Sequence, residues 1–440
     1  MHQFFKSTWL NFEVVRILGT APNGGADICE VLEAVEQIEE GNAESWHDAW
    51  KTQAERAHAT ARRCLAAGNR ELARRAFLRA ANYTRASGYL LLHDADDHNP
   101  RALAIAEAAV ALFRRGITLS DHPVEFLEIP YPGGVHLPGY LYLPPHDPQQ
   151  KDHKVPVLIA CNGADSTQEE LYFLHPAAAP GQGYACLTFD GPGQGLTLRR
   201  HRLTLRPDWE YVMGHVVRFL HAWVSAHPRM QPGLDLDRIA ITGSALGGYF
   251  ALRAAAHDPH RTFKACVALD PVYDLWDFAT HHVSPAFIRA WQHGWIPADA
   301  VDAIINVAAR CSFQMRWEVA LAKDFFRLAR PSEVLLEMRK FSLKGDEHEH
   351  GLGHGPSADG GCPTLVSGAG DSLYLPVDDH TMKIWTALQH LPETARELWL
   401  AEKPADGALQ AKIGAFALSN EYAFRFLDEQ LGVVRERITG

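Results

Sequence analysis

From about residue 122 onward, short apolar runs alternate with helical stretches, and this alternation limits the folds open to the chain. Helices are expected at 208–226, 247–257 and 378–390, between several of the runs. Strands that alternate with helices form a mostly parallel sheet with helices on both faces. The first two runs join through Pro132–Gly134, which predicts an antiparallel hairpin at one edge. The runs expected to be strands are 125–130, 139–143, 156–161, 184–189, 238–242, 265–269, 363–367 and 396–400.

Two segments lack this rhythm and divide the chain. Residues 1–120 are predicted to form an N-terminal helical domain, with helices from residue 26 to about 118. Residues 275–345 contain no clear strand and are rich in Trp and Phe, which indicates a second helical block, a cap inserted into the sheet domain. The sheet domain then consists of 121–274 and 346–440. Together the two helical parts can roof the carboxyl edge of the sheet, where the sites of such folds lie.

Composition narrows the class of partner. The formal net charge of the 440-residue chain is −11 and its basic residues are scattered, which argues against nucleic acid and anionic membranes as partners. We find no run of 18 apolar residues and no secretory signal at the start. The seven cysteines are odd in number and widely spread, as expected of reduced thiols. We therefore expect a cytoplasmic protein with a small-molecule substrate.

A strand-to-helix turn carries the most specific motif. The expected strand Arg238–Thr242 runs into Gly243, and a helix starts at Gly247. This Gly243-x-x-x-Gly247 frame is typical of the G-x-S-x-G nucleophile elbow, in which glycines permit a sharp turn and close helix packing. The central position holds Ala245 where a nucleophilic serine is expected. The alternative interpretation is a tight turn with no chemistry.

Backbone donors do not depend on that serine. The loop that follows the strand at 156–161 is expected to supply one oxyanion-hole N–H, from Gly163 or Ala164, and Leu246 the other. Because these donors belong to the main chain, loss of the serine side chain leaves them in place. Cys161, at the end of that strand, is interpreted as a buried structural thiol.

The other two positions of a Ser–Asp–His triad are harder to fill. Asp371 follows the strand at 363–367, where such a fold keeps its acid; a turn or helix-cap aspartate is the alternative. The histidine is expected after the last strand, but residues 402–412 hold none. Lys403 and Lys412 are the only titrating bases of that segment. Two of three triad positions therefore look empty.

Two further motifs are assigned no chemistry. The Gly-rich segment Phe189–Gly195 lacks both the Lys-Ser/Thr pair and the glycine order of nucleotide-binding loops. Asp346–His350 with His354 is dense in metal-ligand types, but it matches no zinc spacing and lies in a Gly-rich polar stretch. We therefore expect neither a nucleotide nor a metal.

The motifs together resemble the α/β-hydrolase family that includes 2,6-dihydroxypseudooxynicotine hydrolase and the fungal heptaketide chain-shortening hydrolases of pigment biosynthesis. More distantly they resemble the fermentation-respiration-switch esterase-like group. The resemblance covers nearly the whole chain. The segments that carry it are Gly24–Ile28, Ala80–Ala86, Asn162–Ser166, Phe189–Gly195, Arg206–Glu210 and Gly247–Tyr249.

The resemblance implies an α/β-hydrolase fold with a helical cap and a Ser–His–Asp site. Family members cleave carbon–carbon bonds of β-dicarbonyl or polyketide-like molecules or hydrolyse esters, need no metal or organic cofactor, and often form homodimers. Carried over, Ala245 falls on the nucleophile, Asp371 on the acid, and the histidine position within 403–412. Residues weighed as substitutes are Ser244, Asp165, Asp270, Asp274, the cap histidines His281 and His282, and Lys403.

Three hypotheses remain open from the sequence. The first is an enzyme of this lineage that no longer forms a covalent intermediate and uses the oxyanion hole with an Asp or His base for cyclisation, dehydration, aldol-type closure or retro-Claisen cleavage. The second is a conventional hydrolase seen as an inactive variant. The third is a binding or scaffold protein. A site that merely binds a ligand has no reason to keep titratable groups around the elbow, so the residues that line the pocket would distinguish the third hypothesis from the other two.

Overall fold

The computed structural model describes residues 2–91, 100–145, 154–281, 283–344 and 361–435. Its centre is a mixed sheet of eight strands in the order β1-β2-β4-β3-β5-β6-β7-β8. β1 and β2 pair antiparallel, as do β2 and β4, and all other neighbours are parallel. The strands are β1 Val124–Tyr131, β2 Val135–Tyr142, β3 Lys154–Cys161, β4 Ala185–Phe189, β5 Gly233–Ser244, β6 Phe263–Leu269, β7 Thr364–Ala369 and β8 Arg396–Ala401. The predicted strands, the hairpin edge and the α/β fold class are confirmed.

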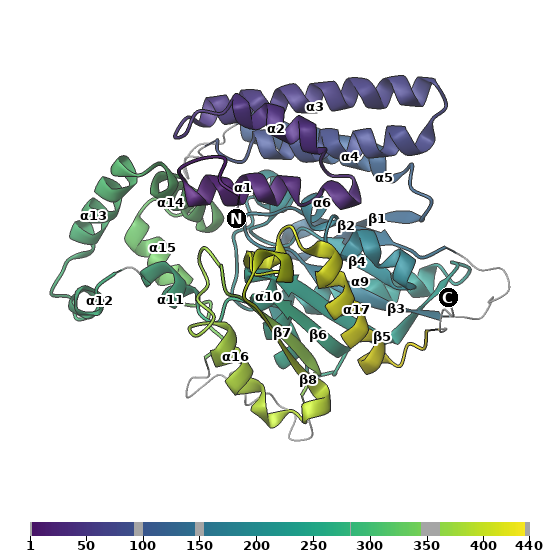
Figure 1. Cartoon of the computed structure of the whole chain (residues 1–440). Coiled ribbons are helices and arrows are strands. Elements are labelled where there is room, and N and C mark those ends of the chain that lie inside the picture. Colours follow the sequence, from purple (N-terminus) through teal and green to yellow (C-terminus); the bar gives the residue numbers. More distant parts are fainter. Residues whose placement is uncertain (1, 92–99, 146–153, 282, 345–360, 436–440) are drawn as a thin grey trace.

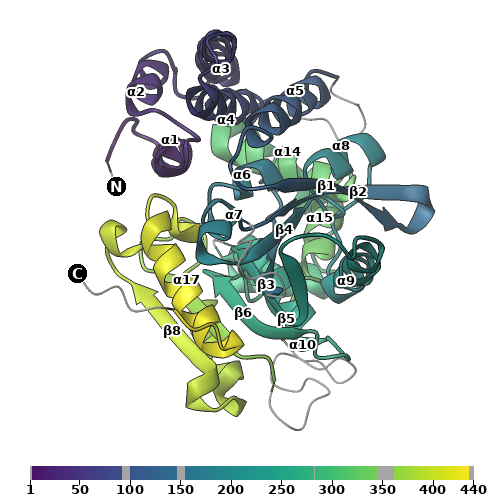
Figure 2. The same ribbon diagram turned by 90° about the vertical axis from the view of Figure 1, so that its right-hand side faces the viewer.

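Helices cover both faces of the sheet, so its central strands are apolar on both sides (Figures 1 and 2). Val157 and Ile159 of β3 join the core under α9 and α10, whereas Leu158 and Ala160 join the core on the other face, which α17 covers. This period of two follows from the pleat of a strand. The helices of the sheet domain are α6 Gln168–Leu171, α7 His175–Ala178, α8 Gly195–His201, α9 Trp209–Ala226, α10 Leu246–Ala256, α16 Thr381–Ala387 and α17 Phe416–Leu431.

The N-terminal helices pack above the sheet, at the top of Figure 1. They begin earlier than the sequence predicted, because α1 precedes residue 26 and starts at a capping serine, Ser7, whose hydroxyl accepts from the N–H of Leu10. Phe12 of α1 belongs to the core of the sheet domain, so this block is built onto the sheet. The helices are α1 Thr8–Leu18, α2 Ile28–Glu36, α3 Ala43–Ala66, α4 Arg70–Ser87 and α5 Pro100–Ile117.

A helical block follows β6, at the left of Figure 1. Its fourth helix reaches the N-terminal helices: the Trp317 ring lies 5.1 Å from that of Trp9, and its indole N–H donates to the carbonyl of Tyr89 at 2.8 Å. The two helical parts thus meet at the carboxyl edge of the sheet. The inserted helices are α11 Leu275–Thr280, α12 Pro285–Gln292, α13 Ala298–Cys311, α14 Phe313–Phe326 and α15 Pro331–Met338.

Candidate active site

The turn between β5 and α10 keeps the geometry of a nucleophile elbow. Ala245 has φ 51° and ψ −116°, a conformation that costs a residue with a Cβ about 1–3 kcal/mol. Its N–H donates to the carbonyl of Leu269 at 2.9 Å, which fixes the turn on β6. A Cβ on Gly243 would lie 2.1 Å from the Gly247 oxygen, and one on Gly247 would lie 2.6 Å from the Cys161 oxygen. The glycine frame is therefore required by close packing, and the strained position is kept although it carries only a methyl group.

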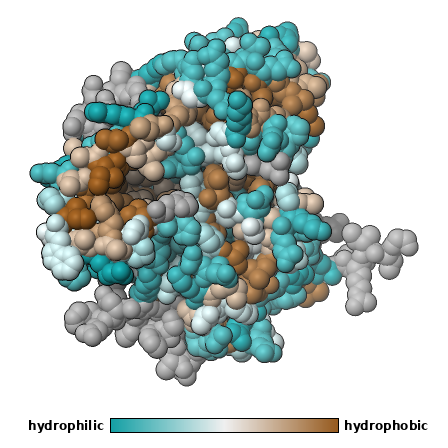
Figure 3. Space-filling model, turned by 60° about the vertical axis from the view of Figure 1, so that its left-hand side comes forward, coloured by the Kyte–Doolittle hydropathy of each residue, from teal (hydrophilic) through white to brown (hydrophobic). Residues whose placement is uncertain are grey.

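The elbow faces a cavity of about 300 Å³. Its walls come from the sheet domain, from α1 and from α14, and most of the lining is apolar. The face of the molecule that carries the inserted helices is hollowed, with apolar residues along the hollow (Figure 3). Apolar lining residues include Phe12, Leu171, Leu205, Ala245, Leu246, Val272, Phe278, Trp317, Phe325 and Phe416. A pocket of this kind suits a small molecule with an apolar skeleton.

Two of the residues predicted to form an oxyanion hole, Ala164 and Leu246, have surroundings that leave their backbone N–H groups available. The side chain of Gln194 donates to the carbonyls of Asn162 at 2.7 Å and Gly163 at 3.1 Å. Because C=O and N–H point in opposite directions across a trans peptide, this holds the N–H of Ala164 away from Gln194. The N–H of Leu246 opens α10, where no preceding turn supplies an acceptor. Ala164 and Leu246 both line the cavity.

Gly163 and Ser244 also line the cavity. The N–H of Gly163 is already used, since it donates to Oδ1 of Asn162 at 3.1 Å. The hydroxyl of Ser244 is buried and has no hydrogen-bond partner among the described residues. Ala164 is therefore the freer of the two predicted loop donors.

Behind the elbow lies a buried ion pair. Asp270 directly follows Leu269, the residue that accepts from the elbow, and has φ 46°. Its Oδ1 lies 2.8 Å from Nζ of Lys412 and also accepts from the hydroxyl of Ser367 at 2.8 Å. Nζ of Lys412 further donates to the carbonyl of Gly368 at 3.2 Å. Burial lowers the pKa of Lys412 and Asp270 raises it; the net direction is downward.

A cluster of charged residues forms another wall. Arg16 of α1 donates through Nη1 to Asp165 and through Nη2 to Glu170, both at 2.7 Å. The hydroxyl of Tyr89 donates to Asp165 at 2.7 Å. Glu13 is held more loosely, 3.4 Å from Arg16 and 3.2 Å from the Tyr89 hydroxyl. All five line the cavity.

The acids of this cluster differ in affinity for a proton. Burial raises the pKa of Glu13 to about 7, although Arg16 opposes this. Glu170 is buried as well, but Arg16 and Arg85 together outweigh its burial and lower its pKa below the ordinary value. Arg85, of α4, lies 3.0 Å from Glu170. The pKa of Asp165, whose side chain is 38% exposed, is lowered by its contacts with Arg16 and Tyr89. Glu13 is thus the acid of this group that exchanges its proton near neutral pH.

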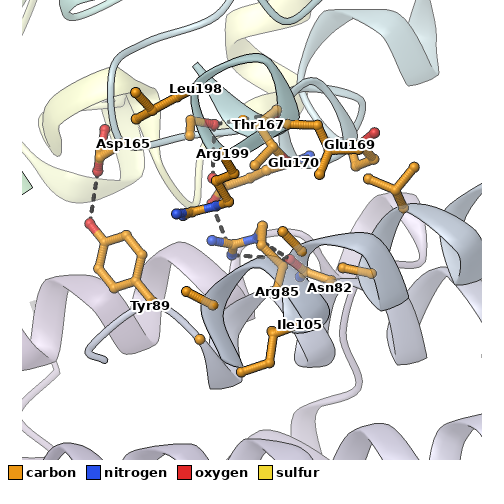
Figure 4. A pocket seen from close by; sticks show the side chains of 18 of the residues that line it. Asn82, Arg85, Tyr89, Ile105, Asp165, Thr167, Glu169, Glu170, Leu198 and Arg199 are labelled. Atoms are coloured by element: carbon orange, nitrogen blue, oxygen red, sulfur yellow. Dashed lines mark hydrogen bonds and ion pairs between the residues drawn. The ribbon is translucent and has the colours of Figure 1, made fainter. Parts of the chain in front are cut away.

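A smaller cavity, of about 70 Å³, shares Tyr89, Asp165 and Glu170 with the larger one. Figure 4 shows it, with Arg85 extending toward Glu170 and the hydroxyl of Tyr89 toward Asp165. Arg199 of α8 also lines it. Residues of the charged cluster therefore line both cavities, the larger one over the elbow and the smaller one that α4 and α8 help to line.

Comparisons with known proteins agree with this geometry. A pattern described as esterase FrsA-like matches residues 28–284, more than half of the chain. Hydrolase ORFZ of Pyricularia oryzae is 51% identical over 441 residues, covering 100% of both chains. The chain belongs to the esterase FrsA-like family.

Two more comparisons describe this FrsA-like chain. Hydrolyase ccsE of Aspergillus clavatus is 48% identical over 445 residues, again covering 100% of both chains. The crystal structure of 2,6-dihydroxy-pseudo-oxynicotine hydrolase has a TM-score of 0.65 at 20% identity, and the match covers 94% of this chain and 96% of that one. The FrsA-like chain is an enzyme of the hydrolase lineage with the α/β-hydrolase fold, as the sequence predicted.

Several predicted residues lie away from the cavity of the FrsA-like chain. Asp371 is exposed and does not line the cavity, so its assignment as the acid stays a prediction. Asp274 caps α11 and pairs with Lys344 at 3.0 Å. His281 and Lys403 are exposed. His282 lies outside the described residues.

No histidine of the described ranges lines the cavity of the FrsA-like chain. His380 is buried elsewhere, where its Nδ1 accepts from the N–H of Tyr273 at 3.1 Å and burial lowers its pKa to about 4. The Asp346–His350 segment and His354 lie outside the described residues; within the described part, no group of three metal-ligand side chains was found. No helix of that part is long and apolar enough to cross a membrane.

Proposed function

We propose that this FrsA-like enzyme acts on a carbonyl group of a small polyketide-like, β-dicarbonyl or ester molecule in natural-product metabolism, without an acyl-enzyme intermediate. The observation that carries the proposal is Ala245. It keeps the strained elbow conformation and faces the cavity, but a methyl group cannot attack a carbonyl carbon. Water is then the nucleophile for carbon–carbon or ester cleavage.

The two backbone donors support a carbonyl as the reacting group. In this proposal the N–H groups of Ala164 and Leu246 form the oxyanion hole and hold the oxygen on which negative charge develops. Donors fixed in place stabilise that charge without reorganising during the reaction. Gln194 keeps the Ala164 donor oriented through its bonds to two carbonyls of the loop.

The lining supports the substrate class. The walls are largely aromatic and aliphatic, which fits the carbon skeleton of a polyketide-like molecule. The polar lining residues include the five of the charged cluster. The inserted helices would act as a cap, since α14 forms part of the wall. Titratable groups around the elbow favour an enzyme over a protein that only binds its ligand.

A second reaction, the loss of water from a β-hydroxycarbonyl compound, is the other candidate. The relative ccsE is named a hydrolyase, and a site without a nucleophile suits proton transfer next to a carbonyl. The same donors would stabilise the enolate formed on that route. Both candidate reactions use the bound carbonyl group, but cleavage consumes one water molecule and elimination releases one.

The experiment uses β-diketone, ester and β-hydroxyketone probes in water labelled with oxygen-18. Cleavage by water places the label in a carboxylate product, whereas elimination lowers the substrate mass by one water and leaves no label there. Intact-mass spectra of the protein and of Ala245→Ser should show no acyl adduct, because no described histidine lines the cavity to activate a serine. Acylation of Ala245→Ser, with hydrolysis by that variant alone, would contradict the proposal and indicate a knocked-out serine hydrolase.

A further inference from the structure

The charged cluster has more acids than bases. Glu13, Asp165 and Glu170 are held around Arg16, and Arg85 is the second guanidinium in contact with them. Arg16 lies 2.7 Å from Asp165 and from Glu170 but 3.4 Å from Glu13. An uncompensated charge away from water is costly, so the acid with the weakest contacts keeps a proton. Geometry alone assigns that proton to Glu13.

Among the described residues, the groups found around Glu13 include no cation beyond Arg16 and Arg85. From the segment after α4, the Tyr89 hydroxyl lies 3.2 Å from it, farther than from Asp165, at 2.7 Å. From the segment after β7, Tyr374 lines the same cavity, and its hydroxyl donates to Glu318 of α14 at 2.7 Å. The groups around Glu13 are thus Arg16, Arg85, Asp165, Glu170, Tyr89 and Tyr374, and Glu318 is the hydrogen-bond partner of Tyr374. The raised pKa of Glu13, about 7, agrees with this surplus of acids.

Glu13 also faces the space where a substrate would lie. It is 4% exposed, yet it lines the cavity that holds Ala164, Ala245 and Leu246. A buried acid that lines the substrate cavity can exchange its proton with a bound molecule. The other acids of the cluster hold short ion pairs to arginine, which fixes them as carboxylates.

We propose that Glu13, supplied by the N-terminal helix α1, is the catalytic acid–base group of this enzyme. The inference rests on the proposed function, because it assigns the proton transfers of a reaction at a bound carbonyl. The sequence predicted an aspartate or a cap histidine for these transfers. Among the described residues that line the cavity there is no histidine, and the aspartate, Asp165, is paired with Arg16.

For cleavage by water, one carboxyl group suffices. Glu13 as a carboxylate takes a proton from water while the water oxygen bonds to the carbonyl carbon, and the carbonyl electron pair moves onto the oxygen held by the two N–H groups. When that pair re-forms the C=O bond, the adjacent carbon–carbon bond breaks and its electrons stay on the leaving carbon. The proton on Glu13 passes to that carbon. One water is added and Glu13 returns to its starting form.

For loss of water, the same group takes the proton from the carbon beside the carbonyl. It then returns that proton to the departing hydroxyl group, which leaves as water while the C=C bond forms. Both reactions therefore need one acid–base group on the cavity wall, and the inference is independent of which of them occurs.

The test compares the full chain with Glu13→Gln, Glu13→Asp and, as a matched control, Glu55→Gln at an exposed position of α3. Turnover is followed across pH 5 to 9. Exchange of hydrogen for deuterium beside the carbonyl of an alkyl methyl ketone reports proton transfer alone, and the infrared band of a protonated carboxyl group is followed over the same pH range. Thermal unfolding checks that each variant is folded.

We expect Glu13→Gln to lower kcat by about 10²-fold to 10⁴-fold, Glu13→Asp to restore part of it, and Glu55→Gln to match the parent. The neutral-pH ionisation should vanish from the rate profile and from the infrared spectrum of Glu13→Gln. If Glu13→Gln turns over with the parent's rate and profile, the proposed function stands and the inference is overturned. If the parent turns over none of the probes, the proposed function fails. The inference is then overturned as well if Glu13→Gln leaves both the carboxyl infrared band and the rate of ketone exchange as they are in the parent.

Discussion

Nζ of Lys412 lies 2.8 Å from Oδ1 of Asp270, and both side chains are buried directly behind the elbow. The ammonium group also lies 4.4 Å from the centre of the Trp399 ring. The resemblance places the family's histidine within 403–412, and Lys412 is the member of that segment that pairs with a buried acid. The pair holds the loop after β8, whose Gln410 and Ala411 line the cavity, against the end of β6.

Lys412→Met should lower the free energy of unfolding by about 3–5 kcal/mol, because it leaves Asp270 buried without its partner. Urea unfolding measures this. The double variant Asp270→Asn with Lys412→Met should lose less than the sum of the two single variants, since neither charge remains. Lys403→Met, an exposed lysine of the same loop, serves as the control. A loss below about 1 kcal/mol for Lys412→Met would show that the pair does not hold the loop.

Stability should depend on pH through Glu13. Its pKa in the folded chain, about 7, is above its ordinary value of 4.5, so the folded state binds this proton more tightly than the unfolded state does. The stabilisation is complete below about pH 4.5 and is lost as pH rises toward 7. Relative to Glu13→Gln, the parent should lose about 3 kcal/mol between pH 4.5 and 8. Parallel urea curves for the two proteins over this range would contradict the assignment of the proton.

Gln194→Leu should lower kcat about a hundredfold with a smaller change in KM, because the Ala164 donor loses its fixed direction. The unfolding free energy should fall by about 1–3 kcal/mol, since the carbonyls of Asn162 and Gly163 lose their partner. Steady-state kinetics and urea unfolding separate the two effects. The control is Gln430→Leu. It removes a glutamine that donates from α17 to the carbonyl of Thr394, and neither residue lines the cavity, so kcat should be unchanged. An equal fall in both variants would indicate a general loss of structure.

Ala245→Gly should raise the free energy of unfolding by about 1 kcal/mol, because glycine adopts φ 51° without the clash of a Cβ. Ala251→Gly, in the middle of α10 and fully buried, should instead lower it by about 1 kcal/mol or more. Opposite signs for the two substitutions in thermal unfolding would confirm that the elbow stores strain. Equal losses would show that the position is relaxed.

The sheet could be predicted because its signals are local. Each strand is a short apolar run in the sequence, and Gly243 and Gly247 mark a turn that needs close backbone approach. The elbow centre and the predicted oxyanion-hole residues follow from strand order, since they are main-chain positions at the ends of β3 and β5. These residues therefore line the cavity as the sequence indicated.

The charged cluster could not be predicted in this way. Glu13 and Arg16 are the charged residues of a mostly apolar helix, which was the available signal, but their partners Asp165 and Glu170 are about 150 residues away in the sequence. Nothing in spacing or periodicity joins segments that distant. The Asp270–Lys412 pair depends in the same way on the meeting of β6 with the loop after β8.

The cavity wall runs from Phe12 in α1 to Phe416 in α17, which has a consequence for biosynthesis. Chains fold largely from the first residues onward as they leave the ribosome. Here the first helix must wait for more than four hundred later residues before its pocket can close. During that interval Phe12, which is buried in the finished fold, lacks part of its packing. Catalytic competence is therefore among the last properties that the nascent chain acquires.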